Sequence, residues 1–179
     1  MAHSHNWLAS RLTRDWLIHS VRSAVAAAVS LLIARAFRLP ESYWAPLTTI
    51  VVMQSTLGAA WTPSVQRFLG TALGAAFGDV VATYLPSNVL VFTVGIFVLG
   101  LICALLGLDR SAYRFSGITL AIVLLVAHNR TPWIVALHRF FEVSVGIIVG
   151  LAISALWPQK PSAAPVAAPA AVPPAAPQN

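Results

Sequence analysis

Apolar residues follow one another in six long runs along the chain instead of alternating with polar ones. The runs occupy residues 17–37, 44–61, 65–85, 89–107, 112–129 and 134–157. Each run is close to the roughly 20 residues that an α-helix needs to cross the hydrocarbon core of a bilayer. Strands of a membrane β-barrel would alternate apolar and polar positions over about 10 residues. The pattern therefore predicts an all-α, polytopic membrane protein with six transmembrane helices.

The ends of these runs carry residues that are typical of a membrane boundary. Trp and Tyr favour the headgroup region, and proline is tolerated at helix ends. The aromatic residues at the ends are Tyr43, Trp44, Trp61, Tyr84, Tyr113, Trp133 and Trp157. The prolines expected between runs or just beyond one are Pro40, Pro63, Pro86, Pro132 and Pro158, and Pro46 falls in the first turn of the second run. Both sets agree with the predicted spans.

The same pattern divides the chain into a polar segment at 1–15, a six-helix membrane domain at 16–158 and a tail at 159–179. The tail is almost wholly Ala and Pro, a composition that cannot pack a core, so we expect it to be disordered. The first run also fits the apolar region of a signal peptide, because arginines precede it and small residues follow. Cleavage would leave five helices, whereas the continued membrane pattern favours a retained helix.

Composition and charge agree with a membrane protein. Charged residues make up 9% of the chain, against about 25% in typical soluble domains, and the mean hydropathy is +0.80. A cytoplasmic N-terminus would put five flanking basic residues inside and three outside, in weak agreement with the positive-inside rule. The net charge of +6 comes without a basic cluster interleaved with aromatic residues, so it does not predict nucleic-acid binding.

Residues typical of catalytic or metal chemistry are scarce. Cys103 is the only cysteine, so the sequence predicts neither a disulfide nor a thiolate metal site. The five histidines are scattered, and no zinc-protease, hydrolase or phosphate-loop motif occurs. We therefore expect no enzyme activity, no metal and no cofactor. An enzyme acting on lipid is the alternative, and no residue pattern calls for it.

Glycines recur at four-residue spacing in two of the runs. Gly70, Gly74 and Gly78 lie on one face of the third predicted helix, and Gly146 and Gly150 on one face of the sixth. In lipid, helices associate closely where small side chains let their backbones approach. We expect both faces to pack against other helices, either within the chain or in a homo-oligomer such as a dimer.

The segment RFLGTALGAAFG at 67–78 is similar to RFFEVSVGIIVG at 139–150. Both begin with Arg-Phe and carry glycine seven and eleven residues after the arginine. The chain therefore reads as a three-helix unit written twice, although a chance match of a few positions would look the same. Because each unit has an odd number of helices, the copies would face opposite ways across the bilayer, as in the 3+3 inverted repeats of transporters.

Charged residues inside the predicted helices are costly in lipid, so they mark either structural pairs or a transport pathway. With the two units inverted, Asp79 should share a layer with Arg139 and Glu142. Arg22 and Arg67 should share the opposite layer. The alternative for Arg139 and Glu142 is a purely structural pair, since they lie three residues apart on one helix.

Four residues form the candidate substrate site: Arg67, Arg139, Thr48 and Gln54. The two arginines would attract an anion, although arginines near helix ends also reach out to lipid headgroups. Thr48 and Gln54 belong to the polar second helix, where hydrogen bonding between helices is the alternative role. Asp79 and Glu142 are the candidates for exchanging protons, with structural pairing as the alternative.

Three segments carry a further pattern. Tyr43, Trp44, Ala45, Leu47 and Thr48 fit a YWAxLT-type segment, Arg67, Gly70, Thr71, Gly74 and Gly78 fit an RxxGTxxGxxxG segment, and Arg139, Glu142, Gly146 and Gly150 fit a closing helix. Together they resemble the fusaric acid resistance family, also grouped with the aromatic acid exporters, over about residues 16–158. The resemblance implies a multi-pass protein of the bacterial inner (plasma) membrane that exports aromatic or other weak organic acids, often with a periplasmic adaptor protein.

The chain departs from that family in size. Longer members resemble two such bundles flanking a cytoplasmic domain, so we expect two copies of this chain to associate as a dimer. The expected function is proton-coupled efflux of small anionic aromatic compounds. The alternative is a non-transporting membrane scaffold or an accessory subunit of a larger transport complex.

Overall fold

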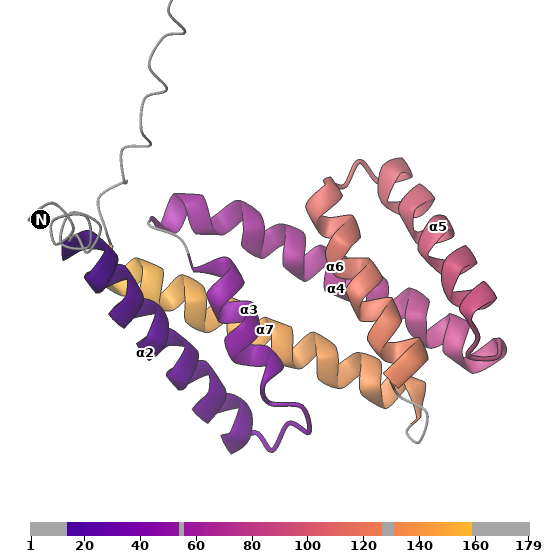
Figure 1. The fold of residues 1–179 in the computed structure, drawn as a ribbon, viewed down its shortest axis with the longest axis horizontal. Helices are drawn as coiled ribbons and strands as arrows, with labels where there is room; N and C mark the ends of the chain where they lie inside the picture. Colours follow the sequence, from indigo (N-terminus) through magenta and orange to yellow (C-terminus); the bar gives the residue numbers. More distant parts are fainter. Residues whose placement is uncertain (1–13, 54–55, 127–130, 159–179) are drawn as a thin grey trace, which may run out of the picture.

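The computed structural model describes residues 14–53, 56–126 and 131–158, and within these ranges it is entirely helical (Figure 1). Its elements are α2 (Arg14–Ala36), α3 (Trp44–Val52), α4 (Leu57–Tyr84), α5 (Val89–Leu105), α6 (Arg110–Ala121), a π-helical segment (Ile122–Val126) and α7 (Pro132–Leu156). The all-α prediction is confirmed for this part of the chain. The predicted tail and most of the polar N-terminal segment lie outside the described residues.

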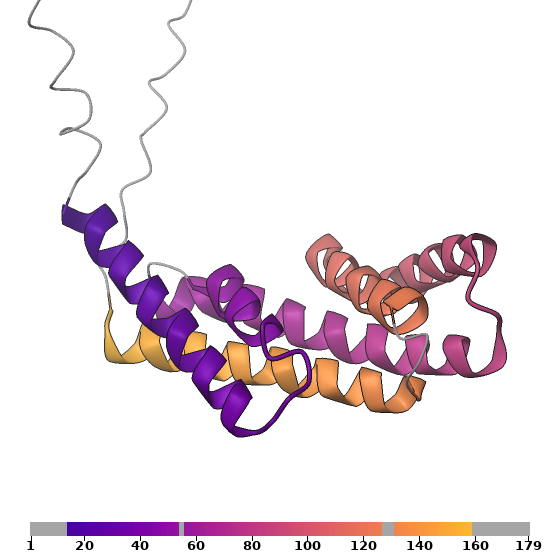
Figure 2. The same cartoon turned by 60° about the horizontal axis from the view of Figure 1, so that its bottom comes forward.

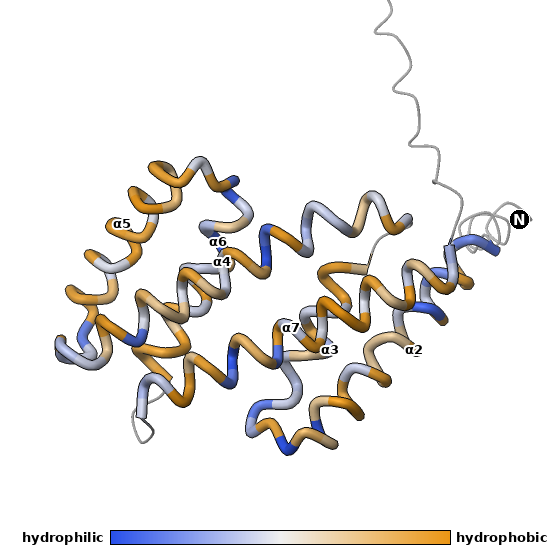
Figure 3. The backbone as a smooth tube through the Cα atoms, turned by 180° about the vertical axis from the view of Figure 1, so that it is seen from behind, coloured by the Kyte–Doolittle hydropathy of each residue, from blue (hydrophilic) through white to orange (hydrophobic). Residues whose placement is uncertain are grey.

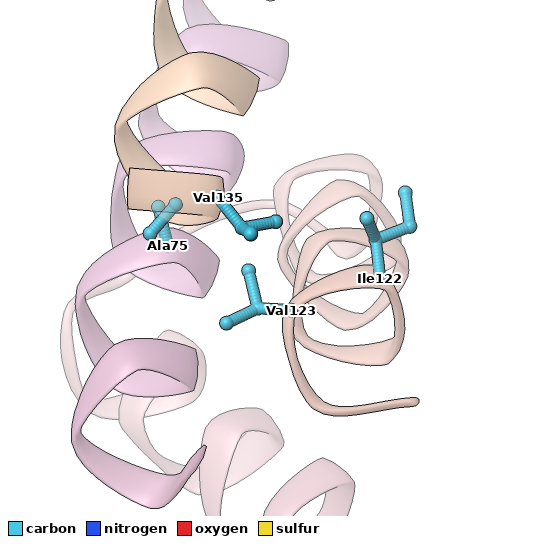
Figure 4. Close-up of a cluster of buried hydrophobic side chains, with 5 residues drawn as sticks. Ala75, Ile122, Val123 and Val135 are labelled. Atoms are coloured by element: carbon cyan, nitrogen blue, oxygen red, sulfur yellow. The ribbon is translucent and has the colours of Figure 1, made fainter. Parts of the chain in front are cut away.

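The two longest helices, α4 and α7, run antiparallel through the centre of the molecule (Figures 1 and 2). The rings of Phe68 on α4 and Phe140 on α7 lie 5.1 Å apart between their centroids. Helices α2 and α3 lie at one end of this pair, and α5 and α6 lie at the other. Where α4, the π-helical segment and α7 meet, Ala75, Val123 and Val135 pack together in a small apolar cluster (Figure 4).

Apolar and polar residues are distributed in the way expected for a protein surrounded by lipid. Large apolar side chains such as Phe97 and Leu105 are exposed, Leu105 to 86%. Arg22, Arg139 and Glu142 are among the largest fully buried side chains. Apolar residues dominate the helices, with isolated hydrophilic positions along α4 and α7 (Figure 3). By length and composition, α2 and α7 could each cross a bilayer, and α5 is an apolar helix of 17 residues.

Helices α4 and α6 meet along the first glycine series. A Cβ atom added at Gly70 would lie 2.3 Å from the carbonyl oxygen of Ala112, and one added at Gly74 would lie 2.3 Å from that of Ser116. These distances are far inside van der Waals contact, so only glycine fits at either position. Gly78 is less tight, because its added Cβ would lie 3.3 Å from the nearest side-chain atom. The contacts advance in the same direction on both helices, which therefore run parallel.

Helices α7 and α3 meet in the same way along the second series. A Cβ atom at Gly146 would lie 2.4 Å from the carbonyl oxygen of Ala45, and one at Gly150 would lie 3.2 Å from Cγ1 of Val52. The hydroxyl of Thr49 also donates a hydrogen bond to the carbonyl of Gly146 across this contact, at 3.0 Å. Both glycine faces therefore pack within the chain.

The prediction for the second run was wrong in its boundaries. Helix α3 ends at Val52, and α4 begins at Leu57 instead of near 65, so Pro63 lies inside α4 and not between helices. The cause is the hydroxyl of Thr56, which accepts a hydrogen bond from the backbone N–H of Ala59 at 3.2 Å and so starts the helix early. The candidate Gln54 lies outside the described residues.

Replacing Pro63 with alanine should stabilise the protein, because it restores the donor for the backbone bond that proline interrupts within α4. We expect a gain of about 1 kcal/mol in the free energy of unfolding, less than the ~3 kcal/mol of a water-exposed helix because neighbouring groups in membrane helices partly compensate. Thermal unfolding in detergent measures it. The control is Pro46→Ala, in the first turn of α3, where the missing N–H has no helical partner and the change should be small. A loss of stability in Pro63→Ala would contradict a continuous α4.

Candidate functional site

A buried ion pair on α7 forms the centre of the candidate site. Nη1 of Arg139 lies 3.5 Å from Oε2 of Glu142, one helical turn away, and the two side chains are 2% and 0% exposed. The other oxygen of Glu142, Oε1, accepts a hydrogen bond from the backbone N–H of Glu41 at 3.1 Å. The guanidinium carbon of Arg139 lies 3.8 Å from the ring centroid of Trp44 on α3. The pair is thus held between α7 and the start of α3.

The connection between α2 and α3 contributes a residue that sequence reasoning missed. The carboxylate of Glu41 accepts hydrogen bonds from the indole N–H of Trp44 at 2.9 Å and from the hydroxyl of Tyr43 at 3.3 Å. Glu41 therefore fixes the indole that covers Arg139. A signal was present, because the chain has only five acidic residues and this one directly precedes the aromatic segment at the start of α3.

Arg67 approaches the same part of α3 from α4. Its Nε donates to the hydroxyl of Thr48 at 3.1 Å, and its guanidinium carbon lies 4.5 Å from the ring centroid of Phe115 on α6. The residue is 7% exposed. Thr48 follows Trp44 by one turn, so the two arginines contact successive turns of α3, and their positive charges repel each other. The described residues give Arg67 no carboxylate partner.

The predicted layers of charge were wrong. Asp79 does not join Arg139 and Glu142: it lies about 18 Å beyond Arg67 along α4, half-buried, with no hydrogen bond or ion pair to the described residues. Arg22 lies away from Arg67, because its Nη1 donates to the carbonyl of Trp157 just beyond α7. The reason is the overlap of α4 and α7, which brings their Arg-Phe segments together at mid-length.

Two cavities lie beside these residues. The smaller one, about 10 Å³, is lined by Pro40, Glu41, Val135, His138, Arg139 and Glu142. The larger one, about 230 Å³, lies between α4 and the α5–α6 connection and includes Trp61, Gln66, Asp109 and Ala112 in its lining. At its edge, the side-chain amide of Gln66 donates a hydrogen bond to the carboxylate of Asp109. Nowhere in the described ranges do three His, Cys, Asp or Glu residues gather as metal ligands would.

Comparison with known proteins identifies the family of the chain. Residues 27–153 match the model of a family described as "Fusaric acid resistance protein-like". The chain is 30% identical to the Inner membrane protein YeeA of Escherichia coli K12 over 149 residues, which are 80% of this chain and 42% of YeeA. It is 28% identical to proteins named Uncharacterized transporter YdhK, over 160 residues in E. coli K12 (81% of this chain, 23% of YdhK) and 147 in Salmonella typhimurium (74% and 21%).

The chain therefore spans less than half the length of these relatives. No solved structure is significantly similar to it. The matched range contains all residues of the candidate site: Glu41, Trp44, Thr48, Arg67, Phe115, Arg139 and Glu142. With its apolar outer surface and helices able to cross a bilayer, the chain is a membrane protein of the fusaric acid resistance protein-like family.

Proposed function

We propose that this chain is a subunit of a bacterial inner-membrane efflux transporter for small organic anions, aromatic acids among them, driven by proton exchange. Membership of the family and the names of the relatives support a membrane transporter. The observation that carries the choice of substrate is electrostatic. Arg67 and Arg139 are both buried at the centre of the molecule, and the carboxylate of Glu142 pairs with Arg139 but not with Arg67 among the described residues.

A buried charge is costly unless it is paired. Arg67 has a hydroxyl and the face of Phe115 as neighbours, and a cation over an aromatic ring gains only about 0.5–2 kcal/mol. Both carboxylates of the site, those of Glu41 and Glu142, lie on the Arg139 side of α3, so Arg67 has no carboxylate in contact among the described residues. A carboxylate substrate would supply one, and Thr48 is placed to hydrogen-bond to the same group. Glu142, in contact with Arg139, is our first candidate for proton exchange, and Asp79 on α4 is the second.

The proposed architecture is six membrane spans arranged as a 3+3 inverted repeat. The sequence supports it with more matching residues than the Arg-Phe pair alone. A tryptophan six residues before each arginine extends the pattern. The repeated residues are Trp61, Arg67, Phe68, Gly74 and Gly78 in α4 and Trp133, Arg139, Phe140, Gly146 and Gly150 in α7. Every pair is separated by 72 residues. Five identities at constant separation make a chance match a poor explanation.

The contacts of the two helices support the same architecture. Arg139 stacks on Trp44 of α3, and Arg67 stacks on Phe115 of α6. The glycines match as well: Gly146 and Gly150 contact Ala45 and Val52 of α3, and Gly74 and Gly78 contact Ser116 and Val123 on α6 and the π-helical segment. Each long helix therefore packs on the short helix of the other unit, as a two-fold axis between the units would require. Units of three helices related in this way face opposite sides of the membrane.

Two further points extend the proposal to assembly. We propose that two copies of the chain form the working transporter. A periplasmic adaptor protein is the proposed partner for export across the cell envelope.

The test is transport by the purified chain in liposomes with an imposed pH gradient, using 4-hydroxybenzoate and protein-free liposomes as the measure of passive leak. Arg67→Gln should reduce specific transport by about tenfold, because a charge-assisted contact is worth roughly 1.5–3 kcal/mol. Arg110→Gln is the matched control, since Arg110 is exposed at the start of α6, and it should transport like the wild type.

Two outcomes would contradict the proposal. If Arg67→Gln and wild type transport equally, the buried arginine does not bind the anion. If folded wild-type protein moves none of a panel of aromatic carboxylates and instead co-purifies with a larger transporter, the chain is an accessory scaffold.

A further inference from the structure

The smaller cavity holds polar groups that the proposed anion site does not use. It lies between α7 and the α2–α3 connection, and its volume is about 10 Å³. Nε of Arg139 and Nδ1 of His138 are both buried and have no hydrogen-bond partner among the described residues. Arg139 is itself 98% buried, being 2% exposed. A buried N–H without a partner is rare and costly, so these two atoms point to a small polar ligand.

The size and the donor set of the cavity fit one water molecule. A single water needs roughly 10–15 Å³ and two to four polar partners. Nε of Arg139 can donate to it, the carboxylate of Glu142 can accept from it, and Nδ1 of His138 can do either according to its tautomer. The titratable or charged residues in the lining are Glu41 from the α2–α3 connection and His138, Arg139 and Glu142 from α7.

His138 lines this cavity without being fully buried. Its Nδ1 is buried, while the residue as a whole is only half-buried. An imidazole with one nitrogen at a buried water and the rest of the ring less buried can take up a proton at Nε2 and release another from Nδ1. The residue that corresponds to His138 in the other three-helix unit is Gln66, directly before Arg67. Its amide side chain cannot relay a proton in this way.

We propose that this cavity binds one water molecule, and that His138 relays protons through that water to and from Glu142. A proton arriving at Nε2 releases the Nδ1 proton to the water, and the water passes one of its own protons to the Glu142 carboxylate. The reverse sequence removes the proton from Glu142 through the water to Nδ1, releases the proton on Nε2, and so returns the imidazole to its starting tautomer. This inference rests on the proposed function, and it adds the route by which Glu142 exchanges protons.

The experiment compares two activities of the same liposomes with His138→Gln. Net uptake of 4-hydroxybenzoate driven by a pH gradient requires a proton to reach and leave Glu142 in every cycle. Exchange of labelled for unlabelled 4-hydroxybenzoate at equal pH on both sides does not. We expect His138→Gln to slow net uptake by about tenfold or more, as loss of a proton-transfer group does, with exchange within twofold of wild type. His19→Gln on α2 is the control, and it should change neither activity.

Three results would overturn the relay. Equal loss of net uptake and exchange would mean that His138 acts only on folding or binding. Unchanged net uptake would mean that protons reach Glu142 by another route. If the wild type shows neither activity, the proposed function is wrong and the relay falls with it. This result is distinguishable from the first two because it is seen in the wild type alone.

Discussion

Glu142→Gln should lower the free energy of unfolding by about 3–5 kcal/mol, the usual cost of removing one partner from a buried ion pair. The variant leaves Arg139 2% exposed with its charge intact, because arginine does not lose its proton in proteins. The repulsion from Arg67 adds to the cost. The amide oxygen of glutamine can still accept a hydrogen bond from the N–H of Glu41. The loss of stability is therefore due to the missing negative charge of Glu142. Reversible unfolding in mixed micelles measures it.

Two related variants test the same ion pair. Arg139→Gln should cost less, because a buried carboxylate left alone can take up a proton and become neutral, which arginine cannot do. The double variant Arg139→Gln with Glu142→Gln should recover most of the stability, since neither charge then remains in the interior. A double variant that loses the sum of the two single losses would show that the groups do not interact.

Gly74→Ala should be the most damaging of the glycine-to-alanine substitutions. The new Cβ would lie 2.3 Å from the carbonyl oxygen of Ser116 and 2.8 Å from its Cα. Both are backbone atoms, so no side-chain rotation relieves the clash, and α4 and α6 must separate along their whole contact. Overpacking costs roughly 1–3 kcal/mol and occasionally more, and we expect about 3 kcal/mol or loss of the folded protein from detergent extracts. Thermal unfolding and size-exclusion chromatography measure it.

Gly58→Ala is the matched control, because Gly58 is on the same helix and a Cβ there would meet nothing within 4 Å. Alanine is favoured over glycine in a helix by up to about 1 kcal/mol, so this variant should be neutral or slightly more stable. If Gly74→Ala behaves like Gly58→Ala, α4 and α6 do not approach as closely as described here.

Much of the helical pattern could be predicted from the sequence because lipid imposes one simple requirement on it. The boundaries of α5 and of the α6 region follow the apolar runs within a few residues. Gln54, Ser55 and Thr56 interrupt the apolar run at 44–61 just after Val52, but a short polar stretch does not by itself distinguish a helix break from the polar face of one continuous helix. The hydroxyl of Thr56 starts α4 beyond this break by accepting a hydrogen bond from the backbone N–H of Ala59. Pro63 was predicted to lie between two helices, whereas it lies inside α4. Membrane helices accept proline when neighbouring groups compensate for the missing hydrogen bond.

The candidate site was predictable as a set of residues but not as an arrangement. Buried charge in an apolar helix identifies Arg67, Arg139 and Glu142 without a structure. Their meeting at one helix depends on how far α4 slides along α7, and a shift of three turns would have placed Asp79 there instead. Helical periodicity contains no information on that shift. His138 was passed over because a lone histidine on an apolar helix gives no signal until its cavity is known.

The glycine contacts have a consequence for how the protein is made. Each joins helices that are far apart in the chain: α3 closes on α7, about 100 residues later, and α4 closes on α6. As the chain leaves the ribosome, the face of α3 that packs on Gly146 and Gly150 therefore lacks its partner until α7 has been made. The contact between α3 and α7 can therefore form only late in synthesis, and a protein truncated before Gly146 should be removed by quality control rather than accumulate.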